Sequence, residues 1–248
     1  RQYAQLTLSA DGVLLHNVTL SFNPAYTVPQ ALYMTGDSTV SNVVVRDSSA
    51  LPIRAKKGLF THCWITNNIA ISSCAGMYLE GSACVRNSYF ARNVGADNTS
   101  GSRFSGVLTL SLNANVRAES CTIVDNVLYS GVAALKCDGA CTVRNCLVWN
   151  NVSDEGRVAN LSIASNDGLA LVGNCTTPTN GLKGAGNIEA DPKLKADRMH
   201  VGETSPCRGA AIAEYAPATD LDGRPRGEHP TIGAFEYFDD GGLSVTVE

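Results

Sequence analysis

The heptad Asn145-Cys146-Leu147-Val148-Trp149-Asn150-Asn151 decides the fold, because variants of it recur along the chain. Successive copies begin 20 to 33 residues apart, and a step of 25 residues is the commonest. A repeat of this length indicates a solenoid in which each repeat forms one coil. The six other copies are Asn17–Asn23, Asn42–Ser48, His62–Asn68, Asn87–Asn93, Ser120–Asn126 and Asn174–Asn180.

Several heptads follow a second short apolar segment, as Gly131–Leu135 precedes the heptad that starts at Asn145. Short apolar segments separated by polar turns are typical of β-strands. We therefore predict two strands per repeat and an all-β fold, a parallel β-helix (β-solenoid) of about seven coils. The other apolar segments are Ala31–Met34, Gly76–Leu79 and Gly106–Leu110.

The alternation within the heptad predicts which side chains face the interior. Positions two and four are mainly apolar, and a period of two turns both inward. Equivalent residues on successive coils then stack about 4.8 Å apart. Position two contributes four cysteines that we expect to be buried thiols: Cys63, Cys121, Cys146 and Cys175. Position seven predicts a ladder of hydrogen-bonded side-chain amides: Asn23, Asn68, Asn93, Asn126, Asn151 and Asn180.

Composition limits the possible partners. The 248 residues carry a formal net charge of −4, which provides no basic surface for nucleic acid. No apolar run reaches the length of about 18 residues that a spanning helix needs, so we expect no direct membrane insertion. The repeat predicts coils over residues 1–180, a C-terminal cap over 181–240 and a linker to a further domain over 241–248. The cap is expected to cover the strand edges at the end of the solenoid.

Four C-terminal segments form an ordered series: Gly186–Pro192, Ser205–Ala210, Asp220–Arg226 and Ile232–Tyr237. The series resembles the C-terminal signature of the choice-of-anchor Q proteins, a bacterial family of right-handed parallel β-helices. The coils are similar to polymorphic outer-membrane-type repeats. The resemblance implies a secreted or cell-surface bacterial protein, sometimes assigned by fold to the polysaccharide lyases or glycosidases. Arg208 and Thr231 depart from the family pattern, which usually has acidic residues there.

If the protein is exported, as the resemblance implies, its nine cysteines favour disulfides. The stacked cysteines of position two are poorly placed for a bridge, because their parallel Cβ vectors lie a full strand spacing apart. Cys137 and Cys141 flank an Asp-Gly turn, and Cys74 and Cys84 flank an expected strand, so either pair is a candidate. The sequence leaves the pairing among these four and Cys207 open.

Aromatic residues at outward positions of the heptad suggest glycan binding. Trp64 and Tyr89 occupy position three of successive heptads, and Trp149 occupies position five. Exposed rings on a flat sheet suit the apolar faces of sugar units. The alternative is that another segment packs over the rings, because outward faces of parallel sheets are commonly covered.

Position six carries the candidates for catalysis, Asp47, Arg92 and Asp125, with Arg46 beside them. The alternative for Arg92 and Asp125, which fall on successive heptads, is a surface ion pair. No two outward carboxylates stack on neighbouring heptads, as an acid–base pair would require.

One tail segment, Asp220-Leu221-Asp222-Gly223, resembles the start of a calcium loop. It lacks the downstream acidic ligand, so a turn closed by the aspartates' own hydrogen bonds is favoured and no cofactor is expected. Asp220 and Asp222 remain the only weak candidates for metal binding.

The sequence therefore favours a non-catalytic extracellular module, an adhesin-like spacer that binds a polysaccharide or host glycan on an outward sheet face. The alternative is a polysaccharide lyase or glycoside hydrolase acting on an acidic polysaccharide. A converging set of charged side chains in an open groove would favour the enzyme, and a covered face would favour a structural role.

Overall fold

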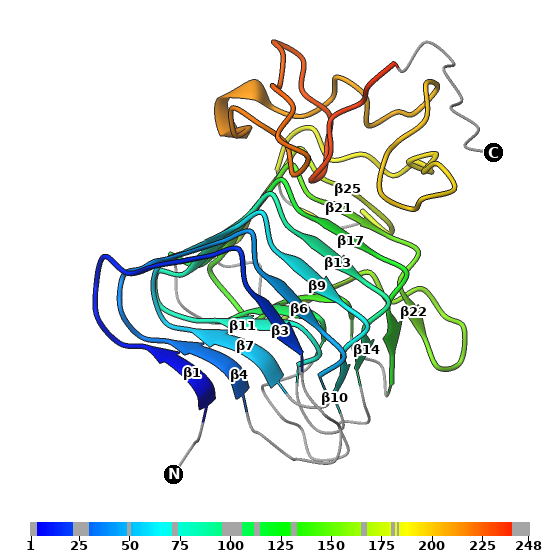
Figure 1. The fold of residues 1–248 in the computed structure, drawn as a ribbon. Helices are drawn as coiled ribbons and strands as arrows, with labels where there is room; N and C mark the ends of the chain where they lie inside the picture. Colours follow the sequence, from blue (N-terminus) through cyan, green and yellow to red (C-terminus); the bar gives the residue numbers. More distant parts are fainter. Residues whose placement is uncertain are drawn as a thin grey trace, which may run out of the picture.

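The chain winds into stacked coils of short parallel strands (Figure 1). This computed structural model describes residues 4–21, 30–48, 51–70, 74–95, 106–111, 115–129, 133–164, 168–179, 182 and 184–239. Three of its sheets have seven strands each, and a fourth has four strands. Seven stacked strands span six full turns, so the predicted parallel β-helix is confirmed. No helix in the described ranges is long and apolar enough to cross a membrane.

We name the sheets A to D in the order in which each coil visits them. Sheet A contains β1 (Ala4–Leu8), β4 (Gln30–Met34), β7 (Leu51–Ala55), β11 (Met77–Leu79), β15 (Leu108–Leu110), β19 (Leu135–Cys137) and β23 (Leu161–Ile163). Sheet B contains β2 (Leu14–His16), β5 (Thr39–Ser41), β8 (Leu59–Thr61), β12 (Cys84–Arg86), β16 (Arg117–Glu119), β20 (Thr142–Arg144) and β24 (Ala170–Val172).

Sheet C follows sheet B in each coil, and sheet D adds a further strand to four of the coils. Sheet C contains β3 (Thr19–Ser21), β6 (Val44–Arg46), β9 (Trp64–Thr66), β13 (Tyr89–Ala91), β17 (Thr122–Val124), β21 (Leu147–Trp149) and β25 (Cys175–Thr176). Sheet D contains β10 (Ile69–Ala70), β14 (Val94–Gly95), β18 (Val127–Leu128) and β22 (Val152–Ser153). The prediction of two strands per repeat is therefore wrong. Sheets A and C are the predicted pair, whereas sheet B is formed by the three residues before each heptad.

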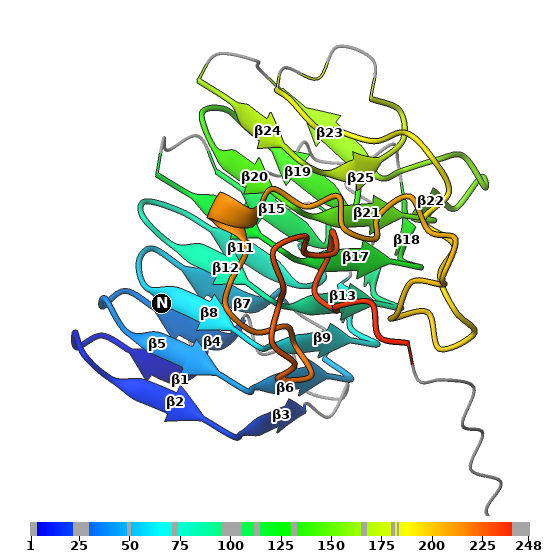
Figure 2. The ribbon, with the colours of Figure 1, turned by 90° about the horizontal axis from the view of Figure 1, so that it is seen from above.

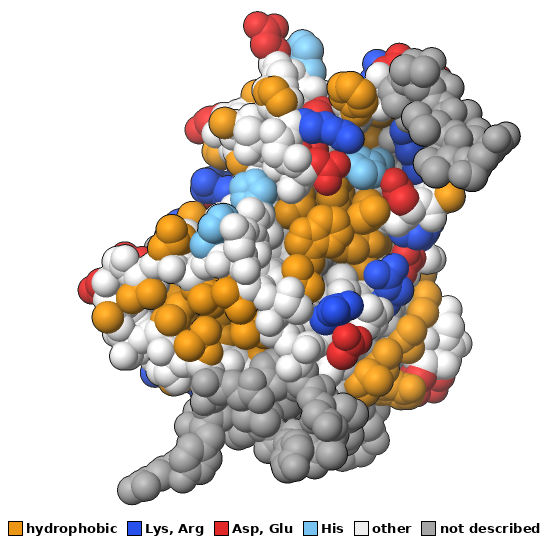
Figure 3. Space-filling view, viewed as in Figure 1, with side chains coloured by type: hydrophobic (Ala, Val, Ile, Leu, Met, Phe, Trp, Pro, Cys, Tyr) orange, Lys and Arg blue, Asp and Glu red, His pale blue; other side chains and the backbone are white. Residues whose placement is uncertain are grey.

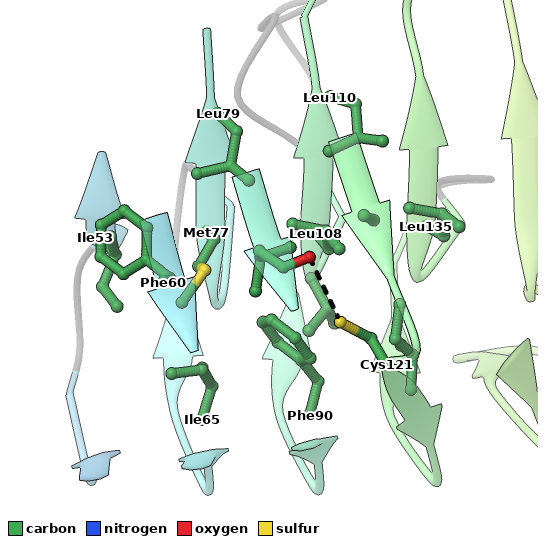
Figure 4. Close-up of a cluster of buried hydrophobic side chains, with 14 of the residues drawn as sticks. Ile53, Phe60, Ile65, Met77, Leu79, Phe90, Leu108, Leu110, Cys121 and Leu135 are labelled. Carbon is green, nitrogen blue, oxygen red and sulfur yellow. Dashed lines mark hydrogen bonds between the residues drawn. The ribbon is translucent and has the colours of Figure 1, made fainter. Parts of the chain in front are cut away.

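Ladders of apolar side chains fill the interior (Figure 4). Ile65, Phe90 and Ile123 occupy position four on adjacent strands of sheet C and are fully buried. The position-two thiols of Cys63, Cys121 and Cys146 are buried in the same core, and that of Cys121 donates to the carbonyl of Val85. Heptad positions two and four thus face inward.

Two columns of left-handed residues form the corners on either side of sheet C. Their φ angles lie between 43° and 68°, a region that costs most residues about 1–2 kcal/mol and that, after glycine, asparagine and aspartate tolerate best. The column between sheets B and C is Asn17, Asn42, His62, Asn87, Ser120, Asn145 and Gly173. The column after sheet C is position six of the heptad: Asp47, Asn67, Arg92, Asp125 and Asn150.

A ladder of buried amides runs beside the second corner. The Nδ2 group of each asparagine donates to Oδ1 of the next: Asn68 to Asn93 at 2.9 Å, Asn93 to Asn126 at 2.9 Å, and Asn126 to Asn151 at 2.7 Å. Asn151 continues the ladder to Asn160 at 3.0 Å, a residue outside the heptads. Asn23 and Asn180 lie outside the described residues.

The last heptad is shifted by one residue from the expected alignment. Cys175 pairs with Leu147, a position-three residue, and Gly173 takes the corner with φ +68°. A Cβ atom on Gly173 would lie 2.6 Å from Oδ1 of Asn145, so glycine suits this corner. A shift of one residue turns a side chain to the other face of a sheet. The sequence predicts Cys175 in the inward ladder. This prediction is wrong, because Cys175 lies on the outward face of sheet C.

Only the first part of the C-terminal tail covers the end of the solenoid, as predicted for a cap. Ile188 forms a parallel bridge with Cys175 and so extends the last coil. The segment 191–239 (the cap), which includes a short 3₁₀-helix, η1 (Ala213–Tyr215), then folds back over the outward face of sheet C (Figures 1 and 2).

Side chains of the corner between sheets B and C (the first corner) bind the cap at several points along its length. The ring Nε2 of His62 lies 3.1 Å from the carbonyl oxygen of Asp220. Nδ2 of Asn87 donates to the carbonyl of Thr219 at 2.6 Å. Asn145 both donates to and accepts from the backbone of Ile212 at 2.9 Å. The cap therefore bridges several coils.

A buried arginine organises the cap itself. The guanidinium of Arg226, whose side chain is 2% exposed, donates to the carbonyls of Thr231 and Gly233 and to the Glu236 carboxylate. Burial lowers the pKa of Arg226. Thr231, one of the two residues that differ from the signature that the tail resembles, donates its hydroxyl to Glu236 at 2.6 Å and so has a role in the cap. The other departure, Arg208, stacks its guanidinium on the Tyr237 ring at 4.1 Å.

The amide ladder predicts the effect of Asn126→Ala. This substitution removes donors to the carbonyls of Phe90 and Val124 and leaves the Asn93 amide without its acceptor. Each buried group left unsatisfied costs about 1–3 kcal/mol, so we expect a clear drop in the free energy of unfolding, measured by urea denaturation. The exposed Asn115, changed to alanine, is the matched control and should have little effect. Equal losses for both variants would contradict a stabilising ladder.

Candidate functional site

The predicted glycan-binding face of sheet C is covered by the cap. The Tyr89 ring is 2% exposed and makes edge-to-face contacts with Trp64 at 5.4 Å and Phe235 of the cap at 5.6 Å. Phe235 also contacts Trp64 at 5.8 Å and the His200 ring at 4.8 Å. Burial raises the pKa of Tyr89 to about 12. The rings of Trp64 and Tyr89 therefore pack in an interface, the alternative that the sequence left open.

Figure 3 shows this apolar interface between the cap and the strands of sheet C, with charged and histidine side chains around it. Trp149 lies at its edge and is half-buried. Together with Asn150, Asp191 and Arg198 it lines a cavity of about 280 Å³. Trp149 thus lies beside an open cavity, whereas Trp64 and Tyr89 pack in the interface between the cap and sheet C.

The position-six residues do not converge on one point. Asp125 accepts two hydrogen bonds from Arg198 of the cap, at 2.8 and 2.6 Å, and one from Asn150. Arg92 does not pair with Asp125 but donates to Oδ1 of Asn67 at 3.1 Å. Each of these side chains lies at a left-handed corner, a conformational requirement that accounts for the aspartates and asparagines there.

The remaining candidates for catalysis, Arg46 and Asp47, face solvent. Their side chains are more than half exposed, and the Nε to Oδ2 distance is 3.7 Å. This geometry is that of a weak surface ion pair.

The aspartates of the calcium-like segment serve the cap. Asp220 is fully buried, and its two carboxylate oxygens accept the backbone N–H groups of Arg224 and Glu236, each at 2.7 Å. Asp222 faces Nε2 of His200 at 2.8 Å. In the described ranges no group of three or more histidine, cysteine or acidic side chains could hold a metal ion.

Sheet B carries a cluster of charges that the heptad analysis missed. Glu119 is paired in register with Arg86 on one side and Arg144 on the other. Its Oε2 accepts from Arg86 Nε at 3.0 Å and Nη2 at 2.6 Å. Its Oε1 faces Arg117 Nε at 3.7 Å and Arg144 Nη1 at 3.9 Å. Three guanidinium groups therefore surround one carboxylate, which leaves two positive charges unbalanced.

The exposure of this cluster is uneven. The Glu119 side chain is 6% exposed, whereas those of Arg86, Arg117 and Arg144 are 30–42% exposed. The Arg144 guanidinium lies 4.0 Å from the ring centre of Tyr215, a cap residue in η1, which fixes its orientation. The positive groups thus form the solvent-facing part of the cluster.

Two of the arginines line an open groove of about 590 Å³ along sheet B. The groove runs across β5, β8, β12 and β16, and its lining is mainly polar. The lining residues are Asp37, Ser38, Thr39, Gly58, Leu59, Ser82, Cys84, Arg86, Asn115 and Arg117. This groove (the sheet B groove) is the larger of the two surface hollows described here.

The sheet B groove offers hydrogen-bond donors, and the one acidic residue in its described lining is the exposed Asp37. Burial raises the pKa of the Cys84 thiol to about 11, so the thiol is protonated at neutral pH and is a poor nucleophile. Among the described lining residues there is no histidine, lysine or tyrosine. The groove is therefore suited to binding an anion rather than to proton transfer.

All nine cysteines are buried free thiols, so neither candidate disulfide is present. Cys74 donates to the carbonyls of Met77 and Val107 behind sheet A, whereas Cys84 lies beside Glu119 on sheet B. The neighbouring Cys141 thiol and burial both raise the pKa of Cys137.

The Asp125–Arg198 contact predicts a pH-dependent contribution to stability. Burial acts to raise the pKa of Asp125, but the hydrogen bonds from Arg198 and Asn150 outweigh it, and the pKa is lowered. A lowered pKa in the folded state stabilises the fold above the unfolded pKa of about 3.9, and this contribution is lost as the pH falls through the folded pKa. We therefore expect Arg198→Ala to cost roughly 1 kcal/mol at pH 7 and less at about pH 3, which lies below the unfolded pKa.

Urea denaturation of both proteins at the two pH values measures this difference. Arg157→Ala is the control, because the exposed Arg157 pairs only with the exposed Glu155. A loss that stays the same at both pH values would show that Arg198 acts through packing rather than through charge.

Comparison with known proteins agrees with the coils. A family model described as the right-handed β-helix region matches residues 6–181, more than half of the chain. Searches among curated proteins and among solved structures gave no match. The matched segment ends where the regular strands end, before the cap begins. By its coils and their stacking, the chain belongs to the right-handed parallel β-helix family.

Proposed function

We propose that this chain is a non-catalytic, extracellular β-helix module of a bacterial surface or secreted protein, and that it binds an acidic glycan in the sheet B groove. The β-helix region occurs both in pectate-lyase-like enzymes and in non-catalytic surface proteins, so the fold alone does not choose between them. The observation that carries the proposal is the cluster of three arginines around Glu119 beside an open groove.

The chemistry of the groove favours an anionic ligand. Guanidinium groups offer planar pairs of donors that match carboxylate and sulfate oxygens. Arg117 contacts Glu119 only at 3.7 Å, so most of its donors are available to a ligand. Thr39, Ser82 and Asn115 add groups that suit sugar hydroxyls.

The shape of the groove favours an extended ligand. Successive strands of sheet B lie about 4.8 Å apart along the solenoid axis. A polysaccharide that runs parallel to this axis therefore meets the outward-facing side chains of a new strand at each coil. The groove crosses four of these strands. A linear polysaccharide fits such a surface better than a compact ligand does.

The original expectation of aromatic stacking on sheet C is replaced by this charged surface. Tyr89 and Trp64 are held in the cap interface, and Trp149 remains a secondary contact at its own cavity. A polysaccharide could engage Trp149 only from the cap edge, on the other side of the first corner from sheet B.

A polysaccharide lyase is the second candidate, because the same arginines would neutralise a uronate carboxylate before proton abstraction. Against it stands the position of the one acidic residue in the described lining, Asp37, which precedes β5 and so lies two strands away from Arg86 on β12. The position-six residues do not supply one, since Asp125 is held ionised by Arg198 and its pKa is lowered. A glycoside hydrolase would need a second carboxylate beside Glu119, which the described outward residues of sheet B do not provide.

Arg117→Ala tests the proposal. A charge-assisted hydrogen bond contributes about 1.5–3 kcal/mol, so the substitution should weaken binding of an acidic polysaccharide about tenfold or more. Isothermal titration with polygalacturonate and with a sulfated glycan measures the effect, and affinity for either should fall with salt. Arg157→Ala, which removes an equal charge at an exposed ion pair, should bind as the original protein does.

Three outcomes would contradict the proposal. Binding that is equal for neutral and acidic glycans would remove the role of the arginines. Binding that is lost equally in Arg117→Ala and Arg157→Ala would show only a net-charge effect. Formation of unsaturated sugar products, seen as new ultraviolet absorbance, would establish the lyase instead.

A further inference from the structure

The three arginines around Glu119 do not pair with it equally. Its Oε2 accepts two hydrogen bonds from Arg86, at 3.0 and 2.6 Å. Arg144 lies farther away, because its Nη1 is 3.9 Å from Oε1, which is beyond hydrogen-bond distance. On the other side of Arg144, the residue in register on β24 is Val172, which carries no charge. Neither neighbour in its column therefore gives Arg144 a hydrogen-bonded anion.

The Arg144 side chain is not held in place by hydrogen bonds of its own. Its Nε is buried and has no hydrogen-bond partner in the described part of the chain. A buried donor without an acceptor is unfavourable, so Arg144 would not adopt this position by itself. The side chain as a whole is 30% exposed. Another contact therefore fixes it at the surface of sheet B.

That contact comes from the cap. The guanidinium carbon of Arg144 lies 4.0 Å from the centre of the Tyr215 ring. Tyr215 belongs to η1, a closed turn in which its N–H donates to the carbonyl of Ile212 at 3.0 Å. Ile212 exchanges two hydrogen bonds of 2.9 Å with the side chain of Asn145, which follows Arg144 directly in the sequence. The turn that carries the tyrosine is thus fixed beside the arginine on which it stacks.

Stacking orients a guanidinium group without using its N–H groups. The aromatic ring attracts the cation through its face, whereas the donors lie in the guanidinium plane and match the oxygens of a carboxylate or sulfate. Arg144 does not line the sheet B groove, but it lies next to the groove. A ligand that leaves the groove at Arg117 on β16 meets Arg144 on the adjacent strand, β20.

We infer that Arg144 binds a further acidic group of the glycan at the edge of the cap, and that Tyr215 is a positioning residue for this contact. The inference rests on the proposed function, because it extends the sheet B groove by one strand. The group bound is an oxyanion, either the carboxylate of a uronic acid unit or a sulfate ester. The cap thereby covers sheet C and, through η1, also completes the binding surface of sheet B.

Isothermal titration of the full chain with polygalacturonate and with dextran sulfate tests the inference. Arg144→Ala should weaken binding about tenfold, because a charge-assisted hydrogen bond is lost. Tyr215→Ala should weaken binding about two- to fivefold, because the guanidinium group remains but is no longer oriented. Tyr215→Phe keeps the ring and should bind as the original protein does. The probe whose binding is weakened identifies the acidic group as a carboxylate or a sulfate.

A double substitution separates positioning from a general effect on the fold. In the Arg144→Ala background, Tyr215→Ala should cause no further loss of affinity, since the group that the ring positions is gone. His62→Ala is the matched control, because it removes a different cap contact, that of the His62 ring with the Asp220 carbonyl. This control should bind both probes as the original protein does. The thermal unfolding midpoint of each variant shows whether the compared proteins are folded.

The inference is overturned if Arg144→Ala binds as the original protein does, or if Tyr215→Ala weakens binding equally in both backgrounds. A loss in His62→Ala as large as that in Tyr215→Ala would overturn it as well. These three results leave the proposed function standing as long as Arg117→Ala reduces the affinity. If the original protein binds neither probe, the proposed function fails and the inference fails with it.

Discussion

The left-handed corners on either side of sheet C are the constraint on which the rest of the structure depends. Each corner forces a turn in the same place on every coil, and so keeps equivalent residues in register. The apolar ladders and the amide ladder follow from that register, since a slip of one residue would turn every side chain of a strand to the other face. Asparagine and aspartate at the corners are thus a requirement of the backbone before they are anything else.

The sequence was sufficient for the features that repeat. The spacing of the heptads predicted the coils, and position four predicted the core column of Ile65, Phe90 and Ile123. It was insufficient where the strands are too short to show a period. Arg86, Glu119 and Arg144 each stand just before a heptad, and only the alignment of those preceding residues would have brought them into one column.

Two predictions, the exposed rings on sheet C and the inward position of Cys175, were wrong for a further reason. The repeat pattern carries no information about tertiary contacts or local shifts. Nothing in the heptads indicates that the tail lies on sheet C, so the packing of Phe235 against Tyr89 was not predicted. The shift at Gly173 was hidden because Asn174 looks like the corner asparagine of the other heptads. The sequence thus assigns the two faces of a strand well only where the corner residue is unambiguous.

The position of the cap determines which outward sheet face is covered and which is exposed to solvent. Sheet C is apolar and covered, whereas the arginine side chains of sheet B are partly exposed to solvent. The corner between the two sheets also holds the cap, because its polar side chains from His62 to Asn145 bind the cap backbone. A solenoid whose coils touch only their neighbours is thereby tied together across several coils.

The position of the cap has a consequence for biosynthesis. The coils are made first and contain the rings of Trp64 and Tyr89, but Phe235, which covers them, lies near the end of the described chain. During synthesis the apolar face of sheet C is therefore bare until the chain has been made as far as Phe235. Exposed apolar surface of this kind promotes aggregation of nascent chains, so a chain truncated before the cap would be most vulnerable to aggregation on the face that the finished molecule keeps hidden.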